Sequence, residues 1–159
     1  MSRVKEIQKK VQQMLKASQD KSGCVKSAAH LHAVSTAAVM LAMKRGENPE
    51  LAAIAGLLHD MQAYQSGTYE NHAALGADLA RQILEEMKVT TEEETDQICS
   101  AIRNHDDKDR TGAPLDEILK DADVLHHCLG DPAKEIKDHE RTRYEKLCEE
   151  FGLIPLRNI

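Results

Sequence analysis

The chain has 159 residues, of which 41% are hydrophobic and 30% are charged. This length and composition fit one globular domain and exclude an intrinsically disordered chain. The net charge of −6 argues against nucleic-acid binding through a basic surface. The longest apolar run, 51–58, is too short to cross a bilayer, and no secretory signal is visible. We therefore expect a cytoplasmic protein with neither a nucleic-acid nor a membrane partner.

Apolar residues recur at helical spacing along nearly the whole chain, beginning with the stripe Val4, Ile7 and Val11. A break at 21–23 ends the first helix, and Gly46 stops the second. Residues 61–70 and 106–114 are expected to form loops. The expected helices span about 4–15, 25–45, 49–60, 71–87, 91–105, 116–129 and 132–151.

Capping signals support several of these boundaries. Asn48 with Pro49 is typical of a helix start, Asn71 is a candidate cap, and Thr91 with Glu94 predicts a capping box. Asp131 with Pro132 predicts the start of the last helix in the same way. The sequence thus predicts an all-α fold, a compact single-domain bundle of about six to seven helices over residues 1–159.

Eight histidines accompany only three Tyr, one Phe and no Trp, and several of them occupy unusual positions. His30 shares an apolar helix face with Val34 and Leu41, and other titratable residues occupy similar faces or helix ends. A single buried His or Asp is usually satisfied by a hydrogen bond or an ion pair. Burying several together costs free energy unless they are satisfied together, and a divalent metal does so. The residues concerned are His30, His59, Asp60, His72, His105 and Asp123.

Three motifs in order resemble those of the HD superfamily of metal-dependent phosphohydrolases. They are H-L-H-A-V beginning at His30, A-G-L-L-H-D ending at Asp60, and L-K-D-A-D-V-L containing Asp123. The segments N-H-A-A-L-G-A-D-L-A at His72 and A-I-R-N-H at His105 resemble the subset with an enlarged metal site. The resemblance covers about residues 25–130 and implies the helical bundle of that family.

The resemblance also implies a ligand set for one or two divalent metal ions (Fe, Mn, Ni, Co, Mg or Zn). His30, His59, Asp60 and Asp123 would bind the first ion. His72 and His105 would bind the second, with Asp60 as a bridge. Asp60 and Asp123 are then also the expected catalytic residues, because they set the charge of the site and orient the attacking water. The choice of Asp123 over Asp121 follows the Ala-Asp of the family motif.

The implied function is metal-dependent hydrolysis of a phosphate ester or anhydride in a nucleotide or related small molecule. One alternative is a di-iron oxygenase that uses the same ligands to activate dioxygen. Another is a non-catalytic sensor module that keeps the metal for structure. Phosphate release, oxygen consumption and the openness of the metal site distinguish the three.

Lys108 and Arg103 are the predicted substrate-binding residues, although a run of charges is more often a solvated loop. Tyr64 and Tyr69 either wall the site or stack a base, or they are ordinary core or surface residues. His126 and His127 are assigned to the surface or to supporting contacts. The last helix, with its thin apolar stripe, packs on the bundle or on a second subunit, which leaves a homodimer open. Four scattered cysteines predict reduced core residues without disulfides.

Overall fold

The computed structural model describes residues 2–18 and 23–156, and eight helices form that part of the chain. Their bounds are α1 Arg3–Ala17, α2 Gly23–Arg45, α3 Pro49–Leu58, α4 Met61–Ser66, α5 His72–Met87, α6 Glu92–Asn104, α7 Pro114–Leu129 and α8 Asp138–Phe151. No strand occurs in these residues, so the predicted all-α class is confirmed. Seven of these eight helices correspond to the seven expected from the sequence, and the short α4 is an addition.

Helix α3 lies at the centre of the bundle. Residues 51–58 are all buried, and the helix contacts α1, α2, α6 and α7. A helix that is apolar on every side needs such neighbours all around it. Its N-terminus is capped as predicted, because the Asn48 side chain accepts hydrogen bonds from the backbone of Glu50 and Leu51. The residues that follow α3, His59 and Asp60, therefore emerge inside the molecule.

A close approach of α2 and α3 depends on Gly56. A Cβ atom added there would lie 2.6 Å from the Cα of Ser35, so only glycine fits without a shift of backbone. The Ser35 hydroxyl also donates a hydrogen bond to the carbonyl of Ala53 at 3.0 Å. This tight contact sets the distance between α2, which carries His30, and the end of α3.

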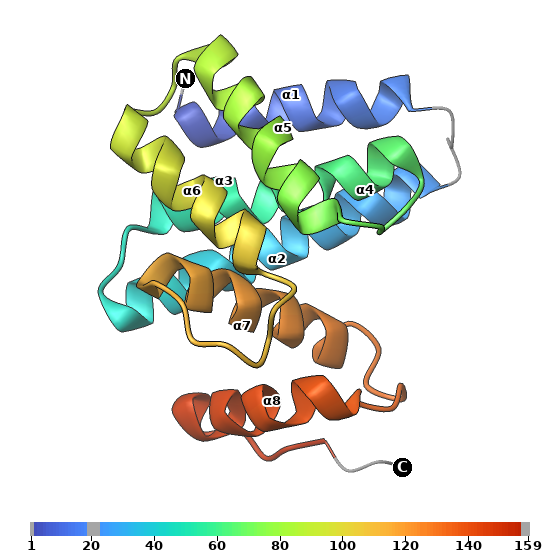
Figure 1. The fold of residues 1–159 in the computed structure, drawn as a ribbon. Helices are drawn as coiled ribbons and strands as arrows, with labels where there is room; N and C mark the ends of the chain where they lie inside the picture. The colour runs from blue at the N-terminus through green and yellow to red at the C-terminus, as the bar shows by residue number, and fades with distance from the viewer. Residues whose placement is uncertain (1, 19–22, 157–159) are drawn as a thin grey trace.

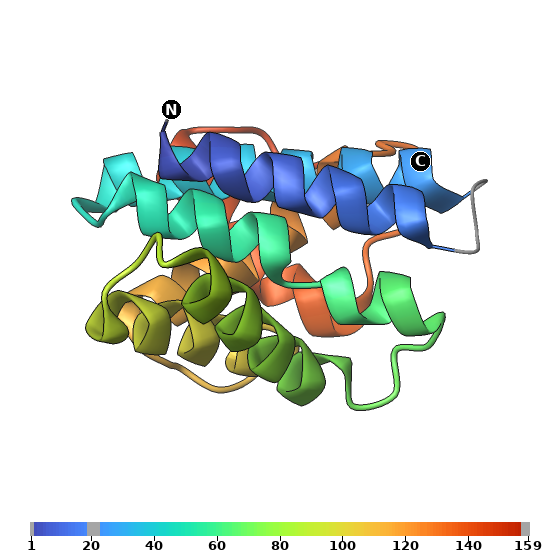
Figure 2. The same ribbon diagram turned by 90° about the horizontal axis from the view of Figure 1, so that it is seen from above.

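The remaining helices surround this pair. Helices α5 and α6 pack on each other, and α6 reaches α3 and α7 (Figure 2). Helix α8 packs on α7 at the end of the bundle opposite α1 (Figure 1). The apolar stripe of α8 is buried there through Tyr144 and Leu147, so this stripe packs on the bundle. No helix in the described part of the chain has both the length and the apolar character needed to span a membrane.

Two local predictions were wrong. Residues 61–66 form helix α4 where a loop was expected, because Met61 and Ala63 are buried against the bundle and Gly67, with φ 72°, ends the helix. Asp131 with Pro132 begins a turn and not the last helix. In that turn the backbone N–H groups of Ala133 and Lys134 donate to the Asp131 side chain and carbonyl, and α8 starts only at Asp138.

Other local signals were confirmed or corrected in detail. The capping box of Thr91 and Glu94 is present, with both hydrogen bonds formed. Gly46 follows α2 with φ 74°. Asn71 precedes α5 as predicted, but it adopts a left-handed conformation and its side chain makes no capping hydrogen bond. The four cysteines are free, and Cys99, Cys128 and Cys148 are buried.

Candidate metal centre

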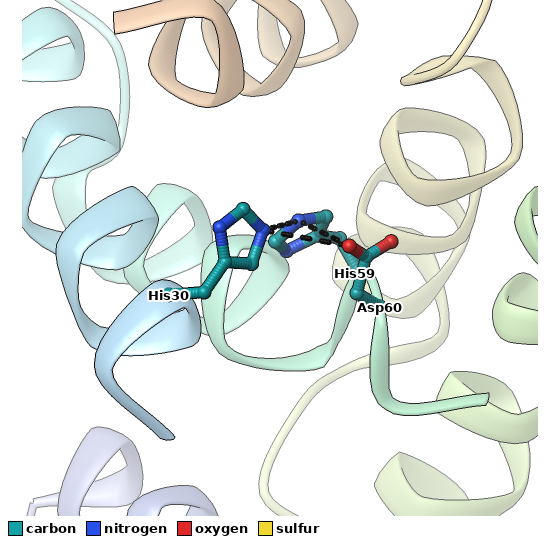
Figure 3. A group of neighbouring side chains, drawn as sticks. All are labelled: His30, His59 and Asp60. Atoms are coloured by element: carbon teal, nitrogen blue, oxygen red, sulfur yellow. Dashed lines mark hydrogen bonds and ion pairs between the residues drawn. The ribbon is translucent and has the colours of Figure 1, made fainter. Parts of the chain in front are cut away.

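The first group of predicted ligands comes together at the junction of α2 and α3. His30 projects from α2 toward His59 and Asp60, which directly follow α3 (Figure 3). The Nε2 atoms of His30 and His59 lie 3.0 Å apart. Oδ2 of Asp60 lies 3.4 Å from the first of these nitrogens and 3.5 Å from the second. All three side chains thus point into one small volume.

Asp123 completes this group from α7. Its Oδ1 lies 3.6 Å from Nε2 of His30 and 3.8 Å from Nε2 of His59. Asp121, two residues earlier, instead forms ion pairs with Arg45 and Arg143. The structure therefore brings Asp123, and not Asp121, to the cluster.

A second group meets the other oxygen of Asp60. Oδ1 of Asp60 lies 3.6 Å from Nε2 of His72 and 3.4 Å from Nε2 of His105. The two imidazole nitrogens are 3.3 Å apart. Asp60 consequently stands between two pairs of histidines, with one oxygen turned toward each pair.

Three of these histidines are held by the same local arrangement at helix ends. Nδ1 of His59, His72 and His105 lies within 2.6–2.8 Å of the carbonyl oxygen three residues earlier in the chain. An N–H must lie between these atoms, so each ring donates from Nδ1 and keeps a lone pair on Nε2. Metal-binding histidines are typically oriented by such a hydrogen bond from their other nitrogen.

Two carboxylate oxygens at the centre of the site have no hydrogen-bond partner among the described residues. Oδ1 of Asp60 and Oδ1 of Asp123 are buried and accept no hydrogen bond in the described part of the chain. They face imidazole lone pairs, and this contact is repulsive unless a cation lies between them. Two atoms bound to one cation at about 2.1 Å lie at most about 4.2 Å apart, and the nitrogen–nitrogen and nitrogen–oxygen distances given above satisfy this limit. The residues present therefore fit one cation per group.

Comparison with protein-family models matches residues 27–128 to the HD domain. The chain belongs to the HD domain family. A solved structure from an uncultured Thermotogales bacterium, described as a predicted HD superfamily hydrolase, is similar with a TM-score of 0.64 and 22% identity. The similarity covers 95% of this chain and 90% of that chain, and at this identity it shows the fold alone. No curated protein matches the chain.

The family expected from the motifs is thus confirmed. The electrostatics of the six side chains described above, which we call the HD cluster (His30, His59, Asp60, His72, His105 and Asp123), suit a metal site. Burial lowers the pKa of His59 to about 4, so its ring is neutral at pH 7. Burial raises the pKa of Asp123, but the ammonium of Lys108 beside it lowers that pKa by more, so the net shift is downward and the carboxylate is ionised. Neutral imidazole and ionised carboxylate are the forms that bind metals.

His105 shows the same demand for a cation. Burial lowers its pKa, but the interaction with the nearby carboxylate of Asp60 raises it more, so the net shift is upward. The position between Nε2 of His105 and Asp60 therefore attracts positive charge, either a proton or a metal ion.

A cavity of about 640 Å³ opens above the cluster, within the range of about 300–1,000 Å³ typical of ligand sites. Tyr64 and Tyr69 form part of its wall, the first of the two outcomes considered for them. Their rings lie edge to face with centroids 6.5 Å apart. Lys26 and Lys137 also line the cavity, and both are exposed. Two tyrosines and two lysines thus line the cavity that leads from solvent to Asp60 and Asp123.

Neither of the two basic residues predicted to bind substrate lines this cavity. Nζ of Lys108 is buried and donates hydrogen bonds to Oδ2 of Asp123 and to the carbonyl of His105, each at 2.7 Å. Lys108 therefore holds the carboxylate of Asp123 in place and does not face the cavity. Arg103 is half exposed and pairs with Asp78 at 2.8 Å on the outside of the bundle.

His127 is the residue at the site that sequence reasoning undervalued. It lines the cavity, and its Nε2 lies 3.3 Å from Oδ1 of Asp123. The available signal was its spacing of four residues from Asp123, which places both on one face of α7. His126 packs its ring 4.7 Å from that of His30 and borders a different, apolar groove.

Proposed function

We propose that this HD-domain protein is a metal-dependent hydrolase that cleaves a phosphate ester or anhydride of a small molecule, such as a nucleotide. The observation that carries the proposal is Asp60. It is a buried carboxylate with an unpartnered oxygen, and it stands between two histidine pairs on the floor of an open cavity. One or two first-row divalent ions suit this set of imidazole and carboxylate ligands.

The openness of the site favours catalysis over a purely structural metal. A structural site is closed by its protein ligands, whereas a catalytic site keeps a position for water or substrate. The cavity reaches Asp60 and Asp123 directly. The structural neighbour described as a predicted HD superfamily hydrolase supports hydrolase activity in general.

When bound, divalent ions lower the pKa of a water molecule and offset negative charge on phosphoryl oxygens. The protein groups supply binding and orientation. Asp60 and Asp123 accept hydrogen bonds from the attacking water and hold it beside the cluster. Lys26 and Lys137 attract an anionic substrate to the cavity, which an acidic protein needs. Tyr69, which is 58% exposed, offers a face for a planar base.

The test is phosphate release by the purified protein, loaded with Mn²⁺ or with Fe²⁺ under anaerobic conditions. The substrate panel contains nucleoside mono-, di- and triphosphates, dinucleotides and simple phosphate esters. We expect release from at least one nucleotide and its loss in Asp60→Asn. Oxygen consumption by the Fe²⁺ form without phosphate release would instead favour the oxygenase alternative.

Three further expectations belong to the proposal. The substrate is a small molecule and not a nucleic acid or a membrane, the protein acts in the cytoplasm, and a homodimer stays a prediction. Light scattering coupled to size-exclusion chromatography measures the oligomeric state directly.

A further inference from the structure

His127 has the contacts of a metal-binding histidine, although it lies outside the five HD motif segments. It belongs to a group with His30 and Asp123 in which the candidate ligand atoms all lie within 4.8 Å of one another. The rings of His30 and His127 are stacked with centroids 5.7 Å apart. Nε2 of His127 lies 3.3 Å from Oδ1 of Asp123, closer to this oxygen than either Nε2 of the first group.

The other nitrogen of His127 is held by a carboxylate from α8. Its Nδ1 lies 2.6 Å from Oε1 of Glu140, which is only 2% exposed. In the neutral ring Nδ1 donates to that carboxylate, and Nε2 is directed at Asp123 with its lone pair free. A carboxylate that holds the far nitrogen of a histidine is a recurrent arrangement behind metal ligands. Glu140 accepts the hydrogen bond from Nδ1 of His127, whereas backbone carbonyls accept it from Nδ1 of His59, His72 and His105.

The two oxygens of Asp123, which faces Nε2 of His127, have different surroundings. Oδ2 of Asp123 is occupied by the ammonium of Lys108 at 2.7 Å, whereas Oδ1 has no hydrogen-bond partner. The Asp123 side chain is 6% exposed, so water does not readily compensate this oxygen. An unpartnered carboxylate oxygen opposite an imidazole lone pair calls for a cation between them.

We propose that His127 is a further ligand of the metal ion held by His30 and Asp123, and that Glu140 positions it. The inference rests on the proposed function, because it requires the first metal ion to bind. It adds one protein ligand to that ion and leaves one position fewer for water and substrate. The helix that supplies Glu140 lies outside residues 27–128, the part matched to the HD domain.

The chain provides a matched control in His126. This residue precedes His127 on α7, is half-buried and packs against the ring of His30. It forms no contact with Asp123 or Glu140 comparable to those of His127, and it does not line the cavity. Removing it therefore tests the effect of losing an imidazole near the site without losing the proposed ligand.

The experiment is a titration of the metal-free protein with Mn²⁺, in which electron paramagnetic resonance measures the free ion. The proteins are the wild type, His127→Ala, Glu140→Gln and His126→Ala. We expect Glu140→Gln to weaken one of the Mn²⁺ sites by about 10–100-fold, as the loss of a supporting carboxylate typically does, and His127→Ala to weaken the same site at least as much. The other site and the His126→Ala protein should match the wild type. Circular dichroism of each metal-free variant verifies the fold.

Co²⁺ gives a second readout that does not depend on affinity. Its visible absorption bands respond to the number and type of ligands, so His127→Ala should shift them and His126→Ala should not. Unchanged affinity and spectra in folded His127→Ala, or equal losses in His127→Ala and His126→Ala, would overturn the inference while the wild type still binds metal. A wild type that binds no Mn²⁺ or Co²⁺ would overturn the proposed function itself.

Discussion

The histidines that face Oδ2 of Asp60 and those that face Oδ1 are held by different parts of the fold. His30 lies on α2 and His59 directly follows α3, and these two helices approach each other closely at Gly56 in the centre of the bundle. His72 and His105 lie at the start of α5 and just after α6, on the outer pair of helices (Figure 2). The first position therefore depends on the close packing of α2 on α3, whereas the second depends on where α5 begins and α6 ends.

This difference predicts that the second metal position can be lost without the first, whereas the reverse is harder. Only Asp60 belongs to both halves. Substitution of Asp60 should therefore weaken both metal positions, substitution of His72 only the second, and substitution of Gly56 the first.

The largest effect is expected from Asp60→Asn. An amide keeps the volume of the carboxylate but loses the charge that both positions share, so binding of both ions should weaken by more than the 10–100-fold typical of losing a supporting contact. Elemental analysis after anaerobic purification, together with phosphate release, measures the loss. Asp78→Asn, which removes an exposed carboxylate paired with Arg103, is the control and should match the wild type.

His72→Ala should remove one ion and leave the other. A site that holds about two ions in the wild type should then retain about one, because His30, His59 and Asp123 do not depend on α5. Elemental analysis of the variant beside His32→Ala, a histidine on α2 outside the cluster, gives the comparison. Equal metal content in the wild type and His72→Ala would leave His72 as a core or substrate residue and the site mononuclear.

Gly56→Ala tests the packing that aligns His30 with His59. The new methyl group would lie 2.6 Å from backbone of Ser35, so α2 and α3 must move apart. Overpacking of this kind costs about 1–3 kcal/mol of unfolding free energy. Urea denaturation of the metal-free protein measures this cost, and Mn²⁺ titration should show weaker binding at the first position. Ser35→Ala is the control, because it removes the hydrogen bond from the Ser35 hydroxyl to Ala53 but keeps the close approach of α2 and α3. Wild-type stability in Gly56→Ala would contradict the proposed role of this packing.

The smallest expected effect is the loss of stability at low pH through two ion pairs of α8, Arg143 with Glu117 on α7 and Glu150 with Arg45 on α2. Burial raises the pKa of Glu117, but hydrogen bonds from Arg143, the Gly112 backbone and Lys120 lower it more. A hydrogen bond from Arg45 lowers the pKa of Glu150. A depressed carboxyl pKa adds stability above its ordinary value of 4.5, and this stability is lost as the pH falls. Each pair should contribute less than about 1 kcal/mol. The Tm of the wild type should therefore fall more between pH 6 and pH 4 than that of Glu117→Gln/Glu150→Gln.

Elements with complete local signals could be predicted from sequence, and those that depend on tertiary contacts could not. The cap at Asn48 and the box at Thr91 and Glu94 carry their own partners, so these helix starts were recognisable. Helix α4 has only six residues and owes its order to the burial of Met61 and Ala63, which no local pattern reveals.

The same distinction applies to the site. The motif residues were identified because their order and context resemble a family, and the structure brings all six together. Lys108 was placed in a solvated loop or against substrate, since nothing nearby in the sequence indicates a buried partner fifteen residues later. His127 was undervalued because its partner Glu140 belongs to another helix.

Helix α8 reaches the cavity from outside the part of the chain that matches the HD domain. It packs mainly on α7, yet it supplies Glu140 behind His127, and Lys137 just before it lines the cavity. The residues that contact His127 and the cavity from this side thus lie outside the part of the chain that carries the family motifs. Changes in this helix can alter the surroundings of the cavity without changing any motif residue.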